Sequence, residues 1–283
     1  MESRFARFLI RFGAIVAMLF LYIPLVIVVL YAFNNSVGQK WPITSFTTKY
    51  FGLAWRSEDL RTSIVNSLQI ATVATILALL LGSAAAFAVH RYRFFGRNAM
   101  SLLLVLPIAL PGIVTAIALL SSFTNFGVTI GLFTTMVGHA TFCIVVVYNN
   151  VIARLRRTPG SLVEASMDLG ADGWQTFRHV TFPAVRTALI AGALLAFALS
   201  FDEIIVTNFL VGAETTVPKF IFNNLRQPRN RPIVNVVAVV AMLIMLIPVI
   251  IAQRLAGGAQ AVGTSGRRRD RAVAVEPLEG AEP

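Results

Sequence analysis

Long apolar runs alternate with shorter polar stretches along most of the chain, and each run has roughly the 20 residues that a helix needs to cross a bilayer. Six runs are predicted to be transmembrane helices, at about residues 12–33, 64–89, 99–120, 132–153, 186–210 and 233–254. They predict an all-α integral membrane protein with a transmembrane domain over residues 1–255. Residues 256–283, rich in Gly and Ala around a basic cluster, are predicted to form a disordered tail.

Two prolines interrupt the third apolar run. Pro107 and Pro111 each lack a backbone N–H, so each bends or breaks a helix that contains it. At membrane depth a broken helix is tolerated where its backbone faces protein or a water-filled cavity. The third run is therefore predicted to face the interior of the protein or a cavity within it.

One long charged stretch, residues 154–185, separates the fourth and fifth runs. Residues 164–169 are predicted to form a short helix that Gly170 ends, and residues 172–180 are predicted to form a second. A loop that only connects two spans does not require two short helices separated by a glycine. The stretch is therefore predicted to be a water-facing loop that docks a partner.

Composition agrees with a membrane protein and excludes other classes. The chain is 57% hydrophobic and 13% charged, with a mean hydropathy of +0.75, and is far more apolar than a soluble domain. Its net charge of +11 comes from arginines at the ends of apolar runs, which indicates membrane topology rather than nucleic-acid binding. The single cysteine, Cys143, excludes an intramolecular disulfide and is interpreted as a small buried hydrophobe.

Six spans place both termini on one side of the membrane. With the termini in the cytoplasm, 16 of the 24 Lys and Arg residues fall on that side, together with the 154–185 stretch. Basic residues accumulate on the cytoplasmic side of membrane proteins. Cytoplasmic termini and a cytoplasmic charged loop are therefore predicted.

The spacing within the charged stretch is specific. Glu164-Ala-Ser is followed after three residues by Gly170, and after nine more by Val-Thr-Phe-Pro183. This pattern resembles the EAA loop of permease subunits of bacterial ABC importers, with Ser, Val and Phe replacing the usual Ala, Ile and Leu. The resemblance implies a type I importer permease fold and a loop that docks in a groove of an ATP-hydrolysing subunit. The residues expected to couple the loop to that subunit are Glu164, Ala165, Ser166, Asp168, Gly170 and Pro183.

The chain has no ATPase motif of its own. Its only lysines, Lys40, Lys49 and Lys219, do not lie in a Gly-Lys-Ser/Thr phosphate loop, so the chain is predicted not to be an enzyme and to hold no cofactor. The resemblance implies that two ATP-binding partner subunits bind ATP and Mg. It adds a second homologous permease, an extracytoplasmic substrate-binding protein and a location in the bacterial inner membrane, with membrane lipid and no nucleic acid among the partners.

Four further stretches, at residues 46–50, 90–94, 139–143 and 199–206, resemble the PotC-type permease of spermidine/putrescine importers. This resemblance covers nearly the whole chain except the tail, and it implies a pathway for polyamines or a related small amine. Gly112 stands where some relatives carry an acidic residue, which leaves γ-aminobutyrate open as an alternative substrate. A proton-coupled secondary transporter is another alternative, and it leaves the loop spacing unexplained.

Asp202 and Glu203 lie inside the fifth predicted span. A carboxylate at membrane depth costs at least ~2.5 kcal/mol, so two adjacent ones are not expected to face lipid. One interpretation is that Asp202, helped by Glu203 and Ser200, attracts and coordinates a cationic substrate. The other is a structural tie to a neighbouring subunit or exposure to a water-filled external vestibule.

Two other residues also have two interpretations each. Trp41 resembles an aromatic residue near the outer mouth of polyamine permeases, where its ring would stabilise an ammonium group, but it also fits an ordinary interfacial tryptophan. His139 either lines the pathway or is an intramembrane histidine satisfied by its neighbours.

Overall fold

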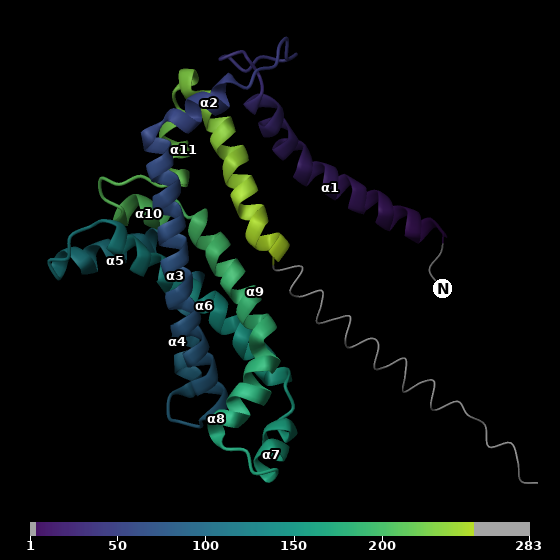
Figure 1. The fold of residues 1–283 in the computed structure, drawn as a ribbon, viewed down its shortest axis with the longest axis vertical. Helices are drawn as coiled ribbons and strands as arrows, with labels where there is room; N and C mark the ends of the chain where they lie inside the picture. The colour runs from purple at the N-terminus through teal and green to yellow at the C-terminus, as the bar shows by residue number, and fades with distance from the viewer. Residues whose placement is uncertain (1–3, 252–283) are drawn as a thin grey trace, which may run out of the picture.

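The computed structural model describes residues 4–251, where the regular structure is helical apart from one isolated bridge between Asn34 and Phe46. Five segments are helices that are long and apolar enough to cross a membrane (Figure 1). They are α1 (Arg4–Ala32), α3 (Glu58–Arg91), α6 (Leu132–Arg157), the continuous segment Gly173–Phe201 and Pro228–Ile251. The predicted all-α membrane fold is confirmed, whereas the predicted tail, residues 256–283, lies outside the described residues.

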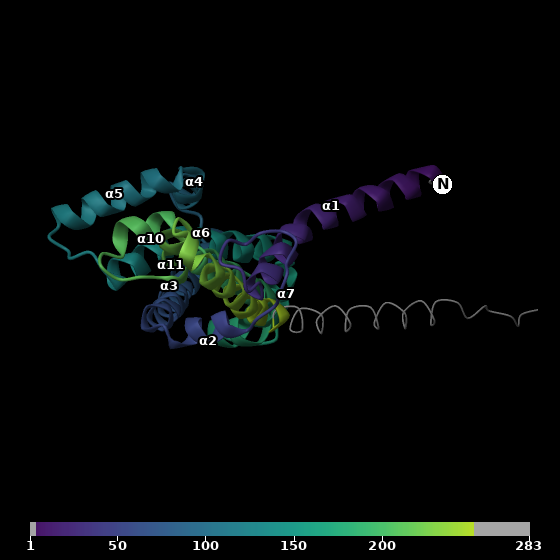
Figure 2. The same cartoon turned by 90° about the horizontal axis from the view of Figure 1, so that it is seen from above.

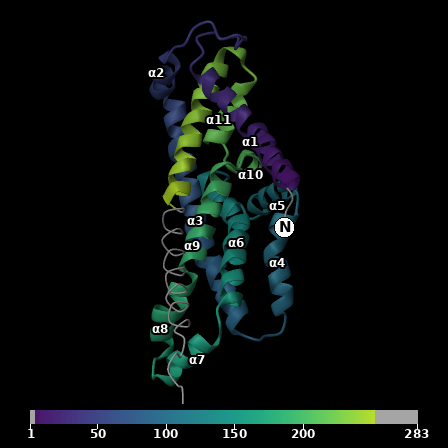
Figure 3. The ribbon, with the colours of Figure 1, turned by 90° about the vertical axis from the view of Figure 1, so that its right-hand side faces the viewer.

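Shorter helices fill the connections between these segments. α2 (Lys49–Arg56) and α11 (Val217–Leu225) lie at one end of the molecule, and α7 (Ser161–Asp168) and α8 (Gly173–Thr176) lie at the other (Figures 1 and 3). The remaining labelled elements are α4 (Arg97–Ala109), α5 (Gly112–Asn125), the π-helical turn η1 (Phe177–Thr181), α9 (Phe182–Phe201), α10 (Ile205–Leu210) and the 3-10 turn η2 (Pro228–Asn230).

The core of the bundle is formed by α3, α6 and α9, which pack against one another. Glycines allow their backbones to approach closely. A Cβ atom on Gly82 would lie 2.7 Å from the carbonyl oxygen of Ile144, and one on Gly192 would lie 3.3 Å from the Cα of Val147. In a bilayer apolar side chains gain little by leaving lipid, so close packing of small residues is a main source of attraction between helices.

α1 differs from the other long helices because nearly all of its surface is exposed. None of its most apolar stretch is buried within this chain, and the helix projects away from the bundle in two perpendicular views (Figures 1 and 2). Its C-terminal end is anchored, since Ala32 is fully buried and the following Phe33 packs on Phe51 with ring centroids 4.9 Å apart. The exposed part is apolar, as a membrane environment requires.

The third predicted span, about residues 99–120, is interrupted as its prolines predicted. α4 and α5 are separated by Leu110 and Pro111, and both have an extended ψ angle. Proline disfavours a helical backbone in the residue before it, which explains why the chain leaves the helix at Leu110. α5 then turns across the bundle instead of continuing α4 (Figures 1 and 3). The six predicted spans thus correspond to five long helices and one broken segment.

The start of the fifth span differs from its predicted limit. The helix begins at Gly173, so the second short helix expected at residues 172–180 is the beginning of the long helix. At η1 the N–H of Phe182 donates to the carbonyl of Phe177, one residue further back than in a regular α-helix. Pro183 explains this π-helical turn, because its ring clashes with regular helical geometry and provides no N–H.

The end of the fifth span also differs from the predicted range, 186–210. α9 stops at Phe201, residues 202–204 leave the helix, and a new short helix, α10, begins at Ile205. Asp202 and Glu203 therefore do not project from a continuous helix. They lie in a gap between two helices.

We predict that Gly82→Ala destabilises the protein, because its new methyl group would meet the backbone of α6 at 2.7 Å. Overpacking of this kind costs roughly 1–3 kcal/mol, so the thermal unfolding midpoint of the purified protein should fall. Gly52→Ala is the matched control, since a Cβ atom on Gly52 in α2 has nothing within 4 Å. Equal midpoints for the two variants would contradict the close packing of α3 on α6.

Candidate functional site

Two interrupted helices meet near the middle of the molecule. One interruption is Leu110-Pro111, and the other is residues 202–204 between α9 and α10, which we call the helix break. α5 packs against α10, and a Cβ atom on Gly112 would lie 3.8 Å from the Cδ1 atom of Ile205. Figures 1 and 3 show α5 and α10 at mid-height. Such backbone is tolerated at membrane depth where protein covers it or where it lines a water-filled space.

The carboxylate of Glu203 holds the start of α10. Its Oε1 atom accepts hydrogen bonds from the N–H groups of Ile205 at 2.7 Å and Val206 at 3.0 Å. The first N–H groups of a helix lack partners within the helix and carry partial positive charge, so an anion is stabilised there. Glu203 is therefore engaged by the protein backbone.

Asp202 occupies the opposite electrostatic position. Its N–H donates to the carbonyl of Ala198 at 3.2 Å, which places Asp202 at the C-terminal end of α9, where unpaired carbonyls carry partial negative charge. Its side chain is exposed, and among residues 4–251 its carboxylate has no hydrogen bond or ion pair. A carboxylate at this end of a helix is destabilised, so a cation would stabilise it.

A buried imidazole joins the helices on both sides of the break. His139 on α6 is 1% exposed; its Nδ1 lies 2.8 Å from Ser200 Oγ and its Nε2 lies 3.0 Å from Thr207 Oγ1. The Thr207 hydroxyl donates to the carbonyl of Glu203 at 2.7 Å, so its oxygen accepts from Nε2–H. Ser200 then donates to Nδ1, and His139 is a neutral imidazole satisfied at both nitrogens. The structure favours the satisfied histidine over a pore-lining one.

This polar network is dry. The space enclosed by Ser67, His139, Ser200, Glu203 and Thr216 is too small for a water molecule. Ser200 is 3% exposed and Thr207 is fully buried, so Ser200 faces the core while Asp202 faces outward. The structure thus separates the three predicted pathway residues of this segment: Asp202 is open, Glu203 caps α10, and Ser200 binds His139.

Trp41 lies in a different part of the molecule. It is 73% exposed, in the connection between α1 and α2 near the end that carries α2 and α11. The helix break lies at mid-height, so the structure does not bring Trp41 together with Asp202 (Figures 1 and 3). Within the part of the chain that the structure describes, no group of three or more His, Cys, Asp or Glu side chains is arranged to hold a metal ion.

A second candidate site is the α7–α8 hairpin, residues Ser161–Thr176, at the opposite end of α9. α7 ends in a Schellman motif in which Gly170 N–H donates to Met167 and Ala171 N–H donates to Ser166, at 2.9 and 3.1 Å. Gly170 has a φ of +87°, a left-handed conformation that glycine adopts without strain. The predicted role of Gly170 as the end of this helix is confirmed.

The second half of the hairpin begins with a capping box. Asp172 Oδ1 accepts from the N–H of Gln175 at 2.8 Å, and Gln175 Oε1 accepts from the N–H of Asp172 at 3.0 Å. Ser166, which replaces an alanine of the EAA pattern, lies 3.1 Å from the hydroxyl of Thr176 and joins α7 to α8. The hairpin is therefore held by its own hydrogen bonds.

Aromatic rings fix the hairpin to the bundle. Phe177 packs against Trp174 and Phe182, and its ring meets Phe87 of α3 edge to face with centroids 5.7 Å apart. Beyond these rings the hairpin exposes apolar side chains at the end of the molecule. The exposed apolar residues are Leu162, Met167, Leu169 and Trp174, of which Leu169 is 89% exposed.

The predicted coupling residues fall into two groups, those exposed on the surface and those that shape the backbone. Glu164, Ala165 and Asp168 are exposed on α7. Ser166 and Gly170 shape the hairpin, and Pro183 is the second residue of α9, directly after the π-helical turn.

Solved structures of ABC transporters share the fold of this chain. One is a bacterial ABC transporter involved in the import of the acidic polysaccharide alginate, matched with a TM-score of 0.70 over 90% of this chain and 98% of that chain, at 15% identity. Another is the inward-facing methionine ABC transporter MetNI, with a TM-score of 0.61 over 72% and 96%, at 17% identity. The chain has the type I ABC importer permease fold.

The chain belongs to the family of binding-protein-dependent transport system inner membrane components, whose family model matches residues 74–258. It is 33% identical over 238 residues to the spermidine/putrescine transport system permease protein PotC of Escherichia coli (strain K12), covering 84% of this chain and 89% of that protein. It is 34% identical over 228 residues to the putrescine transport system permease protein PotI of the same strain, covering 77% and 80%. The chain is thus a multi-pass inner-membrane transport permease and not an enzyme.

Sequence reasoning missed the capping role of Glu203 and the hydroxyl of Thr207. The signal was present, because an acidic residue directly before a run of apolar residues is typical of a helix start. The apolar run from Ile204 to Leu210 concealed it by extending the hydropathy of the fifth span.

We predict that Thr207→Val destabilises the folded protein. The variant keeps the side-chain shape but leaves His139 Nε2–H and the Glu203 carbonyl without their partner, at about 1–3 kcal/mol for each buried unpaired group. Thr124→Val is the control, since the exposed Thr124 hydroxyl donates to carbonyls of its own helix, α5. If both variants unfold at the wild-type temperature, the network does not hold the break.

Proposed function

We propose that the chain is one of two homologous permease subunits that together form the pathway of an ABC importer for polyamines or a related small amine. Two ATP-binding subunits, which bind ATP and Mg, and an extracytoplasmic substrate-binding protein complete the transporter. The relatives support the substrate class, since PotC and PotI are named for spermidine and putrescine transport. The γ-aminobutyrate and proton-coupled alternatives lack such support.

The observation that carries this proposal is the open carboxylate of Asp202. Asp202 is the first residue of the helix break, at the negative end of α9, and its carboxylate has no partner among the described residues. A polyamine is a flexible chain of ammonium groups, and each desolvated ammonium needs an anionic or carbonyl partner. Asp202 and the last carbonyls of α9 provide both, while Glu203 keeps the neighbouring backbone in place.

The same geometry provides a path by which movement driven by ATP hydrolysis is transmitted to the helix break. The continuous helix Gly173–Phe201 has 29 residues, which corresponds to a length of about 43 Å. It carries the α7–α8 hairpin at one end and Asp202 at the other. Movement of a docked ATP-binding subunit would therefore move the helix as a lever and change the surroundings of Asp202.

The positions of the arginines indicate which end of the long helix Gly173–Phe201 faces the cytoplasm. Arg154, Arg156 and Arg157 end α6 next to the hairpin, and Arg93 and Arg97 lie near the same end of α3 and α4. Basic residues accumulate on the cytoplasmic side, so the hairpin and both termini are assigned to the cytoplasm. The helix break then receives substrate from the outer side.

We predict that Asp202→Asn lowers uptake of radiolabelled putrescine by about tenfold or more in cells that express the complete transporter. A charge-assisted hydrogen bond contributes roughly 1.5–3 kcal/mol, and the amide removes the charge while keeping the shape. Asp59→Asn, an exposed carboxylate at the start of α3, is the control. Wild-type uptake by Asp202→Asn in correctly assembled transporter would refute the assignment.

We predict that Gly170→Ala weakens coupling. An L-residue at a φ of +87° costs about 1–2 kcal/mol and strains the hairpin. Stimulation of ATPase activity by the substrate-loaded binding protein should fall several-fold in the reconstituted transporter. Gly160→Ala is the control, because Gly160 has a φ of −60° and a Cβ atom there meets nothing within 4 Å. Equal stimulation in both variants would argue against the hairpin as the coupling element.

A further inference from the structure

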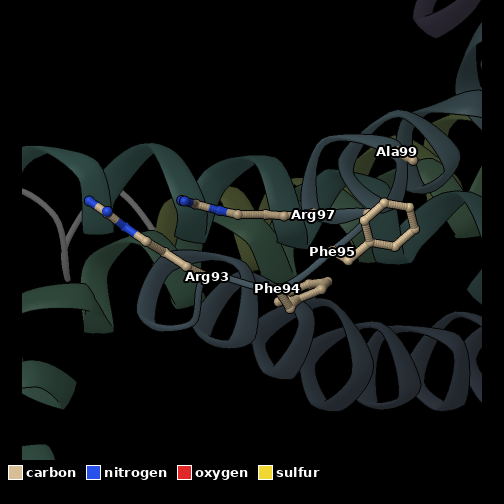
Figure 4. A pocket seen from close by; sticks show the side chains of 6 residues that line it. Arg93, Phe94, Phe95, Arg97 and Ala99 are labelled. Carbon is tan, nitrogen blue, oxygen red and sulfur yellow. The ribbon is translucent and has the colours of Figure 1, made fainter.

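A basic and aromatic turn, residues Arg91–Arg97, joins α3 to α4 at the end of the molecule that carries the hairpin. We call it the basic turn. In Figure 4 the side chains of Arg93 and Arg97 lie side by side with their guanidinium groups pointing the same way, while Phe94 and Phe95 project from the turn in another direction. Together with Gly96 and Ala99 these four residues line an open hollow of about 530 Å³.

The backbone of the basic turn is fixed. Arg97 N–H donates to the carbonyl of Phe94 at 3.3 Å, and Gly96 has φ 84° and ψ 4°, the geometry of the third residue of a type II turn. One turn into α4, the hydroxyl of Ser101 lies 2.9 Å from that of Tyr148 on α6. The two arginines therefore start from positions that the bundle holds in place.

The positive charge of the basic turn has no counter-charge in the described part of this chain. Across residues 4–251, neither Arg93 nor Arg97 has an ion pair or a side-chain hydrogen bond. Further positive charge lies at the same end of the molecule, because Arg154, Arg156 and Arg157 occupy the last turn of α6, next to the hairpin. The ends of α3, α4 and α6 thus bring like charges to one end of the molecule, where an anion would stabilise them.

The position of the basic turn indicates what kind of anion it meets. The turn directly follows the apolar span of α3, and the adjoining surface of α4 exposes Leu102 and Leu103, at 67% and 66%. Phe95 is fully exposed at the turn itself. Guanidinium groups at the membrane boundary and apolar side chains on its hydrocarbon side match the two parts of a phospholipid.

We propose that the basic turn binds an anionic phospholipid, with Arg93 and Arg97 holding its phosphate. Arginine binds phosphate oxygens through paired N–H donors. Phe95 and the exposed leucines of α4 contact the glycerol and acyl part, which a free phosphate ion would leave bare. This site is separate from the helix break and from the hairpin, and it requires only that the chain is a membrane protein.

The test uses the complete transporter in nanodiscs of phosphatidylcholine that contain a minor fraction of phosphatidylglycerol. Native mass spectrometry after release from the nanodiscs counts the phosphatidylglycerol molecules that stay bound. Arg93→Gln with Arg97→Gln should lower the affinity for phosphatidylglycerol by roughly tenfold or more. The control pair, Arg56→Gln with Arg61→Gln, removes two exposed arginines, one at the end of α2 and one in the first turn of α3, and should retain the wild-type count.

Three results would overturn the proposal. In the first, the variant with both arginines changed to glutamine keeps the wild-type count of phosphatidylglycerol. In the second, inorganic phosphate added to phosphatidylcholine nanodiscs raises the unfolding temperature of the transporter as much as phosphatidylglycerol does, which would identify a free-anion site. In the third, the transporter with both glutamine substitutions loses a partner subunit but keeps the lipid, which would identify a protein contact. Arg93→Lys with Arg97→Lys keeps the charge without the paired donors, so intermediate retention by this variant shows that the loss in the glutamine pair is not caused by misfolding.

Discussion

A helix that stops inside a membrane leaves backbone groups that water cannot reach, and this constraint governs the centre of the protein. α9 ends at Phe201, and α10 begins at Ile205. The carboxylate of Glu203 binds the first N–H groups of α10, the hydroxyl of Thr207 binds the Glu203 carbonyl, and His139 joins Thr207 to the last turn of α9. The interruption is stable because a short chain of hydrogen bonds from three helices closes around it.

The closed network also explains why Asp202 is open. Both ring nitrogens of His139 and the hydroxyls of Ser200 and Thr207 have partners in the protein, and the space beside them is too small for a water molecule. Asp202 is left on the outer side, at the end of α9 where a carboxylate is least favoured. A carboxylate that the end of α9 destabilises would be stabilised by a cation, which is the property that the proposed role of Asp202 requires.

Much of this architecture could be predicted from the sequence, because hydropathy, proline and loop spacing are local signals. The apolar runs predicted the long helices, Pro111 predicted the interruption of the third span, and Gly170 predicted the end of α7. The break after Phe201 was not predicted, because Ile204 to Leu210 are apolar and continue the hydropathy of α9. The partners of His139 could not be predicted either, since Ser200 and Thr207 lie 61 and 68 residues away and meet it through tertiary packing.

The two acidic residues show why neighbouring side chains of the same type need separate accounts. Glu203 stands before the first N–H groups of α10, so the protein already neutralises part of its charge, and its removal acts first on the backbone. Asp202 stands after the last carbonyls of α9, so its charge is opposed by the protein and available to a ligand. A variant that changes both residues mixes the two effects. The π-helical turn beside Pro183 and the break at Asp202 then mark the two ends of the regular part of α9, the segment that would carry movement to Asp202 in the proposed mechanism.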